Sequence, residues 1–402
     1  MNAPLMYRIR QQFAAERLAD AGTSLRHELA RSTVTIKPRA RIAIAVGSRG
    51  IANLPLIVGE VVAWVKAQGG EPFIVPAMGS HGGATADGQR RILEKFGVNA
   101  APIVSSMDVV MLEGERLREP SIIEATRRDA RPPVYMDRHA WESDGVIAVN
   151  RIKPHTSFHG MYESGLMKML AVGLGKHEGA TAIHRQGVAG LRERIPVVAR
   201  QVLATGKILL GIAIVENAYD ETLIVRAIPA QRIPDEEPAL LELARRNMPS
   251  LPVNEIDLLI VDEMGKDISG TGMDTNIIGR LRIAGEAEPT RPQIKKIFVR
   301  DLRGDSAYGI GLADVTTRRL VEEADWNATA VNAQTSGFLL RAQLPEVLEK
   351  DDEVIRMAGA RVVRIKNTLH LETLMVSEEI RHEISRRDNI EVLGPAKLWD
   401  EL

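Results

Sequence analysis

The sequence contains no cysteine among its 402 residues. This absence excludes disulfide bonds, zinc sites built on thiolates, cysteine-ligated iron–sulfur clusters and cysteine nucleophiles. It also agrees with a reducing compartment, so we expect a cytoplasmic protein. A metal that needs thiolate or similar sulfur ligands would have to receive them from a bound molecule.

An excess of one charge and long hydrophobic runs are missing as well. The formal net charge is −1 and no extended basic tract occurs, so the chain lacks the electrostatic footprint of a nucleic-acid-binding protein. No run approaches the ~20 apolar residues of a membrane span. The first residues, MNAPLMYRIRQQF, lack the apolar segment of a secretion signal. We therefore expect a soluble protein with neither nucleic-acid nor membrane partners.

Aromatic residues are scarce at 4%, whereas hydrophobic residues make up 45% of the chain. Cores built from Ile, Leu, Val and Ala are typical of α/β proteins. The length favours two or three domains rather than one. A proline-punctuated segment at residues 249–253 (PSLPV) is a candidate linker. We expect an N-terminal catalytic domain at 1–252, which residues 383–402 can rejoin, and a C-terminal domain at 253–382.

Strand-like and helix-like patterns alternate along the first half. Residues 41–46 (RIAIAV), 72–76 (PFIVP) and 145–149 predict strands, residues 53–68 predict a helix, and Thr85 can cap another helix. This β-loop-α order builds parallel sheets. A similar pattern resumes after the linker. The first ~38 residues predict a helical lead-in. We expect an α/β fold of two α/β domains, with mainly parallel sheets and an active-site cleft between them.

Polar residues follow three of the predicted strands. Arg49, His81 and His155 each come shortly after a strand, and parallel strands present their carboxyl ends at one edge of a sheet. Gly82 and Gly83 allow a ligand to approach the backbone. Loops of this kind can cradle a phosphate, although neither GSRG nor GSHGG is a standard nucleotide-binding fingerprint. The three side chains together indicate that this edge of the predicted sheet carries a functional site.

The densest stretch of candidate residues is HTSFHGMYESGLMKMLAVGLGKHEGATAIH, from 155 to 184. His155 and His159 have the spacing of a helical metal pair, but Pro154 and Gly160 favour a turn there. A helix is predicted over 161–172. It places Lys168 among apolar residues, where it either extends its amine to solvent or is kept reactive by desolvation.

These motifs resemble the lactate racemase family, whose members carry a nickel-pincer nucleotide. The resemblance is carried by the loops GSRGIANLP and MGSHGGAT, the run IKPHTSFHGMYESGLMKMLAVGLGKHEGA, and His184. It spans most of the chain, with the strongest motifs in the first half. It implies an isomerase, a racemase or epimerase of a 2-hydroxy acid, that acts by proton-coupled hydride transfer to its cofactor.

The resemblance also implies roles for individual residues. The cofactor, pyridinium-3,5-bisthiocarboxylic acid mononucleotide with nickel, would be attached covalently to Lys168, with His184 as the nickel ligand. His81 and His155 would form the acid/base pair. Arg49 would bind either the substrate or the cofactor phosphate. The remaining expected contacts are to the cofactor from Ser48, Gly82 and Gly83, and to the substrate from Lys266 in the second domain.

Elementary chemistry agrees with these roles. A carboxylate stabilises an adjacent carbanion poorly, whereas removing the hydroxyl proton and transferring a hydride gives a flat 2-oxo acid. Each antipode then needs its own base, and histidine titrates near neutral pH. The family relies on separate maturation enzymes as partners that build the cofactor, so a recombinant chain can lack it.

The sequence departs from the lactate enzymes near the substrate. The segment between His155 and Lys168 is longer, and Gly82-Gly83 stands where those enzymes have Arg-Pro. A larger or differently substituted 2-hydroxy acid, such as a sugar acid, is therefore expected. Two other interpretations stay open: a metal-dependent hydrolase or lyase that uses His155, His159 and Glu163, and a non-catalytic protein that binds an anion or nucleotide.

Overall fold

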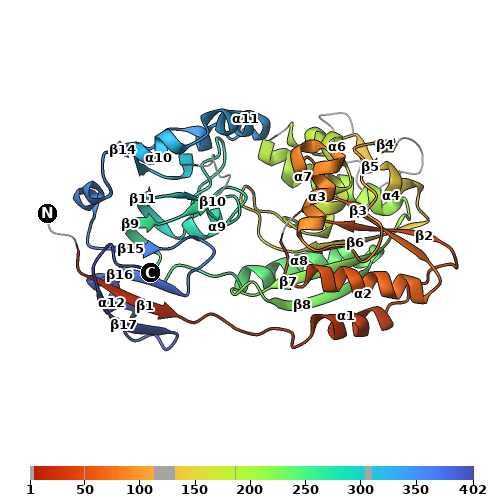
Figure 1. Cartoon of the computed structure of the whole chain (residues 1–402), viewed down its shortest axis with the longest axis horizontal. Helices are drawn as coiled ribbons and strands as arrows, with labels where there is room; N and C mark the ends of the chain where they lie inside the picture. The colour runs from red at the N-terminus through yellow and green to blue at the C-terminus, as the bar shows by residue number, and fades with distance from the viewer. Residues whose placement is uncertain (1–3, 49, 113–131, 186, 304–309) are drawn as a thin grey trace. The chain divides into compact units, whose positions relative to one another are not determined.

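The computed structural model describes residues 4–48, 50–112, 132–185, 187–303 and 310–402. The chain forms two compact units (Figure 1). The first unit contains residues 16–248, and the second combines residues 1–15 with residues 249–402. Each unit is an α/β structure, as the sequence predicts.

The first unit is built on a five-stranded sheet in the order β3-β2-β6-β7-β8. The first four strands in this order are parallel and the last is antiparallel. The strands are β2 (Arg41–Val46), β3 (Glu71–Pro76), β6 (Gly145–Arg151), β7 (Ile208–Glu216) and β8 (Thr222–Pro229). A separate antiparallel pair is formed by β4 (Val109–Leu112) and β5 (Val134–Asp137).

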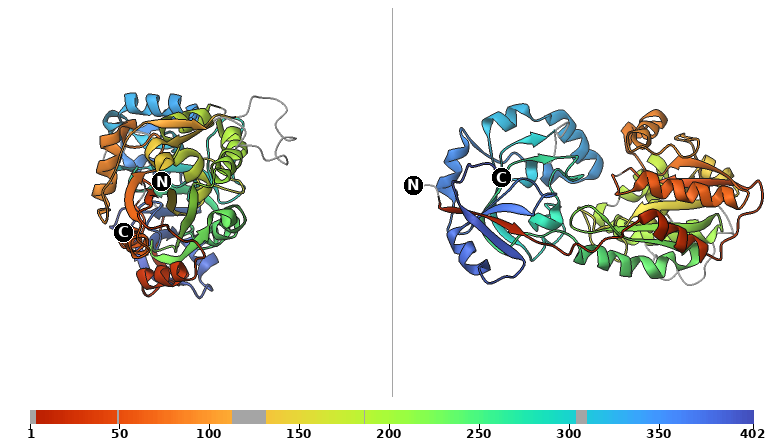
Figure 2. Two further views of the ribbon diagram at one scale, coloured as in Figure 1. Left: turned by 90° about the vertical axis from the view of Figure 1, so that its right-hand side faces the viewer. Right: turned by 60° about the horizontal axis from the view of Figure 1, so that its bottom comes forward.

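Helices cover both faces of this sheet (Figure 2). On one face, Ile42, Ile44 and Val46 of β2 pack in one buried cluster with residues of α1 and α2. On the opposite face, Gly211 of β7 lies against Leu166 and Ile233. The helices are α1 (Ala21–Ala30), α2 (Leu54–Ala67), α3 (Ala86–Lys95), α4 (Arg138–Glu142), α5 (Leu166–Lys168), α6 (Lys176–His184), α7 (Gly187–Ala204) and α8 (Ile233–Arg246).

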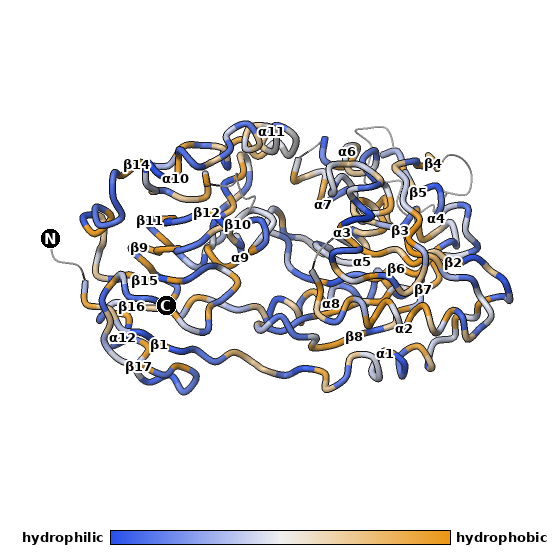
Figure 3. The backbone as a smooth tube through the Cα atoms, viewed as in Figure 1, coloured by the Kyte–Doolittle hydropathy of each residue, from blue (hydrophilic) through white to orange (hydrophobic). Residues whose placement is uncertain are grey.

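Burial on both faces explains why the central strands are almost entirely apolar. Figure 3 shows the hydrophobic segments gathering along β2, β6 and β7. The helix predicted after Thr85 is confirmed, because the Thr85 hydroxyl accepts a hydrogen bond from the amide of Gly88. The helix predicted over 161–172 starts later. Ser164 instead pairs with Lys153 in an isolated β-bridge, and the helical turns begin at Leu166.

The second unit contains an eight-stranded sheet in the order β14-β13-β11-β9-β15-β16-β1-β17. The five strands from β14 to β15 are parallel, and β16, β1 and β17 continue the sheet antiparallel. Its strands are β1 (Met6–Gln11), β9 (Glu255–Val261), β11 (Gln293–Val299), β13 (Val315–Thr317), β14 (Glu346–Leu348), β15 (Val362–Ile365), β16 (Thr373–Ser377) and β17 (Ile390–Ala396).

Short elements complete the second unit. Two short parallel strands, β10 (Met264–Gly265) and β12 (Leu302–Arg303), pair with each other. The helices are α9 (Thr275–Ile278), α10 (Arg318–Glu323), α11 (Trp326–Ser336) and α12 (Glu378–Ile384). A buried cluster that includes Leu258, Phe298 and Met375 forms a core on the large sheet.

The two ends of the chain depart from the expected organisation. The lead-in is not helical throughout, since residues 6–11 form β1 and only α1 follows as a helix. β1 lies between β16 and β17, so the first residues belong to the second unit. Residues 383–402 stay in that unit as well, instead of rejoining the first. Hydrogen bonds between the chain ends cause this arrangement, and a local sequence pattern does not reveal them.

Helices long and apolar enough to cross a membrane are absent from the described part of the chain.

Candidate active site

Ser48 and His81 form the first pair of candidate residues in the first unit. Ser48 follows β2, and His81 follows β3, its parallel neighbour, so both lie past the carboxyl ends of adjacent strands. Oγ of Ser48 is hydrogen-bonded to Nδ1 of His81. This contact fixes the orientation of the imidazole through Nδ1.

A buried lysine supports the loop that carries His81. The Nζ atom of Lys176 donates to the carbonyl of Pro76 at 2.6 Å and to Oε1 of Gln89 at 3.1 Å. The side-chain amide of Gln89 in turn donates to the carbonyls of Gly79, at 2.8 Å, and His81, at 3.3 Å. The backbone carbonyl groups of the loop are therefore hydrogen-bonded by the buried side chains of Lys176 and Gln89.

Asp137 supplies the countercharge for this lysine. Its Oδ2 lies 3.0 Å from Nζ of Lys176, and both side chains are fully buried. Burial lowers the pKa of Lys176, and the carboxylate of Asp137 opposes this effect. A buried ion pair of this kind is costly to break, because the remaining charge has no compensation.

Two glycines shape the turn after His81. Gly82 has a φ of +66°, and a Cβ on it would lie 2.6 Å from the backbone carbon of Gly88. Gly83 also has a φ of +66°, but a Cβ there would meet open space. Gly82 is thus required by packing, whereas Gly83 leaves its backbone accessible to a ligand.

His155 lies on the loop that follows β6, and a buried carboxylate organises this loop. Glu163 accepts hydrogen bonds from the amide of His155 at 2.6 Å and from the amide of Gly160 at 3.1 Å. It also forms an ion pair with Arg245 at 2.8 Å, and His159 approaches it at 3.3 Å. The Glu163 oxygens are therefore engaged in holding the loop.

Lys168 reaches His155 directly. Its Nζ lies 2.5 Å from Nε2 of His155, although the two residues come from different elements. Lys168 ends α5, and a π-helical segment, Met169–Gly173, continues from it. Such π-segments occur frequently at functional sites.

Glu237, a residue of α8, anchors the first turn of α5, the helix that ends at Lys168. Its Oε2 accepts from the amide of Met167 at 2.8 Å. Complete burial raises the pKa of Glu237 to about 8, and the backbone amides of Met167 and Leu166 oppose the rise. The position of Lys168 therefore depends on a carboxyl group that is largely protonated at neutral pH.

His184 is the last residue of α6, and its environment favours the neutral imidazole. Burial lowers the pKa of His184 to about 4, and the positive charge of Lys168, when that residue is protonated, acts in the same direction. A neutral imidazole is the form that ligates a metal. Lys168 is close enough for its charge to contribute to this lowering of the pKa.

The other expected residues are distributed as follows. Arg49 lies outside the described residues. Lys266 is exposed and belongs to the second unit, just past β10 and beyond the carboxyl end of β9. The first unit thus brings Ser48 to His81, and His155 to Lys168 with His184 nearby.

The described residues do not support a metal site made of His155, His159 and Glu163, which a metal-dependent hydrolase or lyase would need. In the part of the chain that the structure describes, no group of three or more His, Asp or Glu side chains is arranged to hold a metal ion. The carboxylate that this interpretation needs, Glu163, instead binds backbone amides and Arg245.

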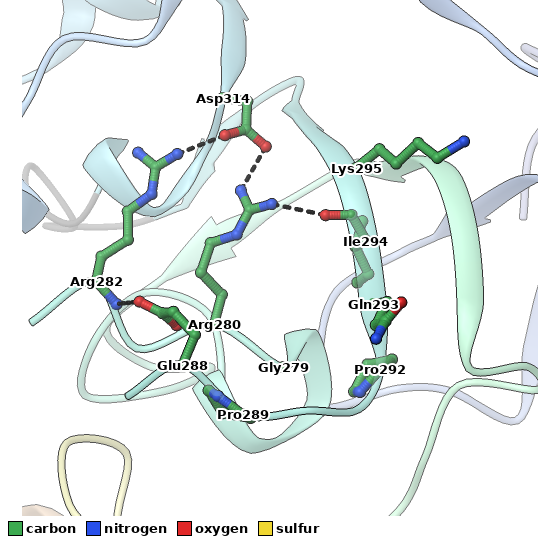
Figure 4. Close-up of a pocket in the computed structure, with 10 residues that line it drawn as sticks. All are labelled: Gly279, Arg280, Arg282, Glu288, Pro289, Pro292, Gln293, Ile294, Lys295 and Asp314. Atoms are coloured by element: carbon green, nitrogen blue, oxygen red, sulfur yellow. Dashed lines mark hydrogen bonds and ion pairs between the residues drawn. The ribbon is translucent and has the colours of Figure 1, made fainter. Parts of the chain in front are cut away.

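A pocket of about 440 Å³ in the second unit has a different character (Figure 4). Arg280 and Arg282 line it, and both guanidinium groups pair with Asp314. Lys295 extends away from this cluster and pairs with Asp257. The pocket lies at the amino ends of β11 and β13, opposite to the edge where parallel sheets bind ligands. We interpret its charges as structural.

Residues 34–232 match a family described as "Domain of unknown function (DUF362)". Among solved structures, the chain is similar to the lactate racemase apoprotein from Thermoanaerobacterium thermosaccharolyticum. The identity is 14%, the TM-score is 0.47, and the match covers 95% of this chain and 92% of that one. No curated protein matches the chain.

Sequence reasoning missed the residues that support the site. Lys176, Asp137, Gln89 and Glu237 come from four different elements, and no short motif links them. Glu237 and Lys176 are fully buried in the structure. The sequence shows only that they are ionisable residues. A sequence pattern does not distinguish such residues from a solvated surface.

Proposed function

We propose that the chain is an isomerase that inverts the configuration at C2 of a 2-hydroxy acid. The observation that carries the proposal is the contact between Lys168 and His155, with the neutral imidazole of His184 nearby. A lysine amine and a candidate base are thus in contact, and a histidine in the form that ligates metals lies within range of the charge of the lysine. Reactive groups of this kind are typical of a catalytic centre.

In this proposal His81 and His155 exchange protons with the substrate hydroxyl. The hydroxyl points in opposite directions in the two antipodes when the carboxylate and C2 are held alike. One histidine therefore takes the hydroxyl proton from one antipode, and the other histidine serves the mirror-image molecule. Ser48 orients His81 through Nδ1, and Glu163 holds the backbone of His155.

The residues fit a nickel-pincer nucleotide. Lys168 would be its point of attachment and His184 the ligand of its nickel. The low pKa of His184 keeps that imidazole available to a metal at neutral pH. The open backbone at Gly83 suits an anionic group, and the cofactor's own sulfur atoms suit a chain without cysteine. When bound, this cofactor supplies an acceptor and donor for the hydride that leaves and returns to C2.

Co-expression with the maturation enzymes tests the proposal. Intact mass and metal analysis should show a covalent increment, mapped to Lys168, and one nickel per chain. Lys168→Gln should remove the increment, and His184→Ala should lower the nickel content. His139→Ala serves as the control, since it changes a histidine of α4 that has no role in the proposed site. A chain with neither increment nor nickel would contradict the proposal.

Substrate labelling tests the reaction itself. A panel of 2-hydroxy acids deuterated at C2 should include one that the loaded protein racemises or epimerises with the deuterium retained at C2. Loss of the label to water would indicate proton abstraction from carbon instead. Tight binding of an acid without any turnover would favour a non-catalytic binding protein.

A further inference from the structure

We infer that, before any cofactor is attached, the chain holds Lys168 as an unprotonated amine through the Nε2–H tautomer of His155. This state makes Lys168 a nucleophile toward carbonyl carbons, including those of 2-oxo acids. The inference deepens the proposed function and rests on it in one respect, which is that Lys168 is the residue to be acylated. It adds a positioning role for Ser157, which the resemblance did not suggest.

The tautomer of His155 is determined by the group that faces Nδ1. The backbone amide of Ser157 donates a hydrogen bond to Nδ1 of His155, with a distance of 3.0 Å. A backbone amide can only donate, so Nδ1 must present its lone pair. A neutral imidazole carries one proton, and here that proton resides on Nε2.

The protonation state of Lys168 follows from this tautomer. Its Nζ lies 2.5 Å from the same Nε2. A lysine ammonium has three donors and no acceptor, so it would direct a proton at the Nε2–H group. An unprotonated amine has a lone pair that accepts this hydrogen bond. Both contacts of His155 are therefore satisfied together only when Lys168 is neutral.

The other protonation states each break a contact. If Lys168 were an ammonium that donates to Nε2, the ring proton would move to Nδ1 and face the amide of Ser157. An imidazolium would place protons on both ring nitrogens and oppose both partners. Opposed donors lose a hydrogen bond and repel each other.

The surroundings preserve this geometry. The buried ring of Phe158 lies 4.6 Å from the His155 ring, and Nζ of Lys168 lies 6.0 Å from the Phe158 ring. Glu163 holds the amide of His155 and therefore the turn that brings Ser157 under Nδ1. From α8, Glu237 holds the backbone amide of Met167, the residue before Lys168, at 2.8 Å. Partial desolvation disfavours an ammonium.

The expected chemistry needs no additional reactant. The lone pair of Lys168 attacks the carbonyl carbon of a 2-oxo acid and forms a C–N bond. The two hydrogens of the amine and the carbonyl oxygen then leave as water, which gives an imine. No electrons are gained or lost in this step. An acyl group reacts in the same way, except that its leaving group departs and an amide remains.

Reductive labelling of the cofactor-free full-length chain provides the test. Glyoxylate is added at neutral pH with cyanoborohydride, which reduces the imine to a stable carboxymethyl amine, and peptides are quantified by mass spectrometry. We expect Lys168 to be labelled at least about a hundredfold faster than the exposed Lys66 and Lys95, because a lysine with the ordinary pKa of about 10.4 is unprotonated in only about one molecule in a thousand near pH 7. Equal rates at the three lysines would overturn the inference.

Variants of His155 separate the tautomer from general burial. His155→Gln retains an N–H donor toward Lys168 and should keep most of the fast labelling. His155→Leu removes the donor and should reduce the rate at Lys168 to that of the surface lysines. His139→Leu makes the same change on α4 and should leave the rate unaltered. Fast labelling in His155→Leu would contradict the role of His155.

A spectrum of the unaltered protein tests the tautomer without any variant. Two-bond ¹H–¹⁵N correlation of histidine-labelled protein distinguishes the Nε2–H tautomer, the Nδ1–H tautomer and the imidazolium, and His155→Gln assigns the signal. The Nδ1–H form or the imidazolium at neutral pH would refute the inference. Neither experiment uses nickel or racemase turnover, so its failure is distinct from failure of the proposed function.

Discussion

Glu237 occupies the space that a side chain at Gly165 would need. A Cβ built on Gly165 would lie 2.2 Å from Oε1 of Glu237, while the other oxygen of this carboxyl group binds the amide of Met167. The backbone at Gly165 is extended, so its conformation alone does not require glycine. Close packing against α8 does, and this packing positions the turn that carries Lys168.

Gly165→Ala should therefore destabilise the protein by about 1–3 kcal/mol through overpacking. Glu237→Ala makes room for the added methyl group. In that background Gly165→Ala should cost clearly less, with a coupling free energy on the order of 1 kcal/mol. Urea unfolding of the two single variants and the double variant measures this coupling. Strict additivity would show that the two residues do not share the space.

The raised pKa of Glu237 predicts that stability falls as the pH rises. The unfolded carboxyl has a pKa near 4.5 and the folded one about 8, so the folded state keeps a proton that the unfolded state has lost. Between these values the group lowers the free energy of unfolding by ~1.4 kcal/mol per pH unit. Urea midpoints from about pH 6.5 to about pH 8 should fall in the wild type and stay nearly level in Glu237→Gln.

The lowered pKa of His184 predicts that stability also falls as the pH decreases on the acidic side. Its pKa is 6.5 in the unfolded chain and about 4 when folded, so the unfolded state binds the proton first as the pH falls. The stabilising contribution of this group is present above about pH 6.5 and declines toward about pH 4, by ~3 kcal/mol in total. His184→Gln should flatten this part of the stability profile. An unchanged acid limb would show that His184 titrates normally in the folded protein.

The buried pair of Lys176 and Asp137 should be intolerant of single changes. Lys176→Met leaves a buried carboxylate without its partner and should cost roughly 3–5 kcal/mol. Asp137→Asn in the same chain removes that charge while retaining an oxygen to cap α4, so the double variant should recover part of the loss. Hydrogen exchange at residues 78–84 should accelerate in Lys176→Met, because Lys176 supports the loop of His81 through Gln89.

Much of the first unit was predictable because its signals are local. The apolar run Arg41–Val46 is a strand as expected, and its parallel neighbours place Ser48, His81 and His155 beyond three carboxyl ends. Short strands separated by helices leave few alternatives to a parallel sheet. The edge on which the candidate residues gather follows from this order.

The contacts within the site were not predictable. The sequence placed His155 in a turn and Lys168 in a helix, but the 2.5 Å approach of their nitrogens depends on how Glu163 and Glu237 hold those elements. Similarly, β1 looked like part of a helical lead-in, and its strand conformation results from pairing with β16 and β17 at the far end of the chain.

The amino-acid sequence by itself determined the α/β class, three strands of the first sheet and the candidate residues that follow them, because periodicity and turn residues act over a few positions. Tertiary structure alone decided which of these side chains meet, and which tautomer and charge they adopt. Those properties arise from burial and from hydrogen bonds between distant segments. The buried ionisable side chains of Lys176 and Glu237 show this dependence most directly, since only the folded chain removes them from water.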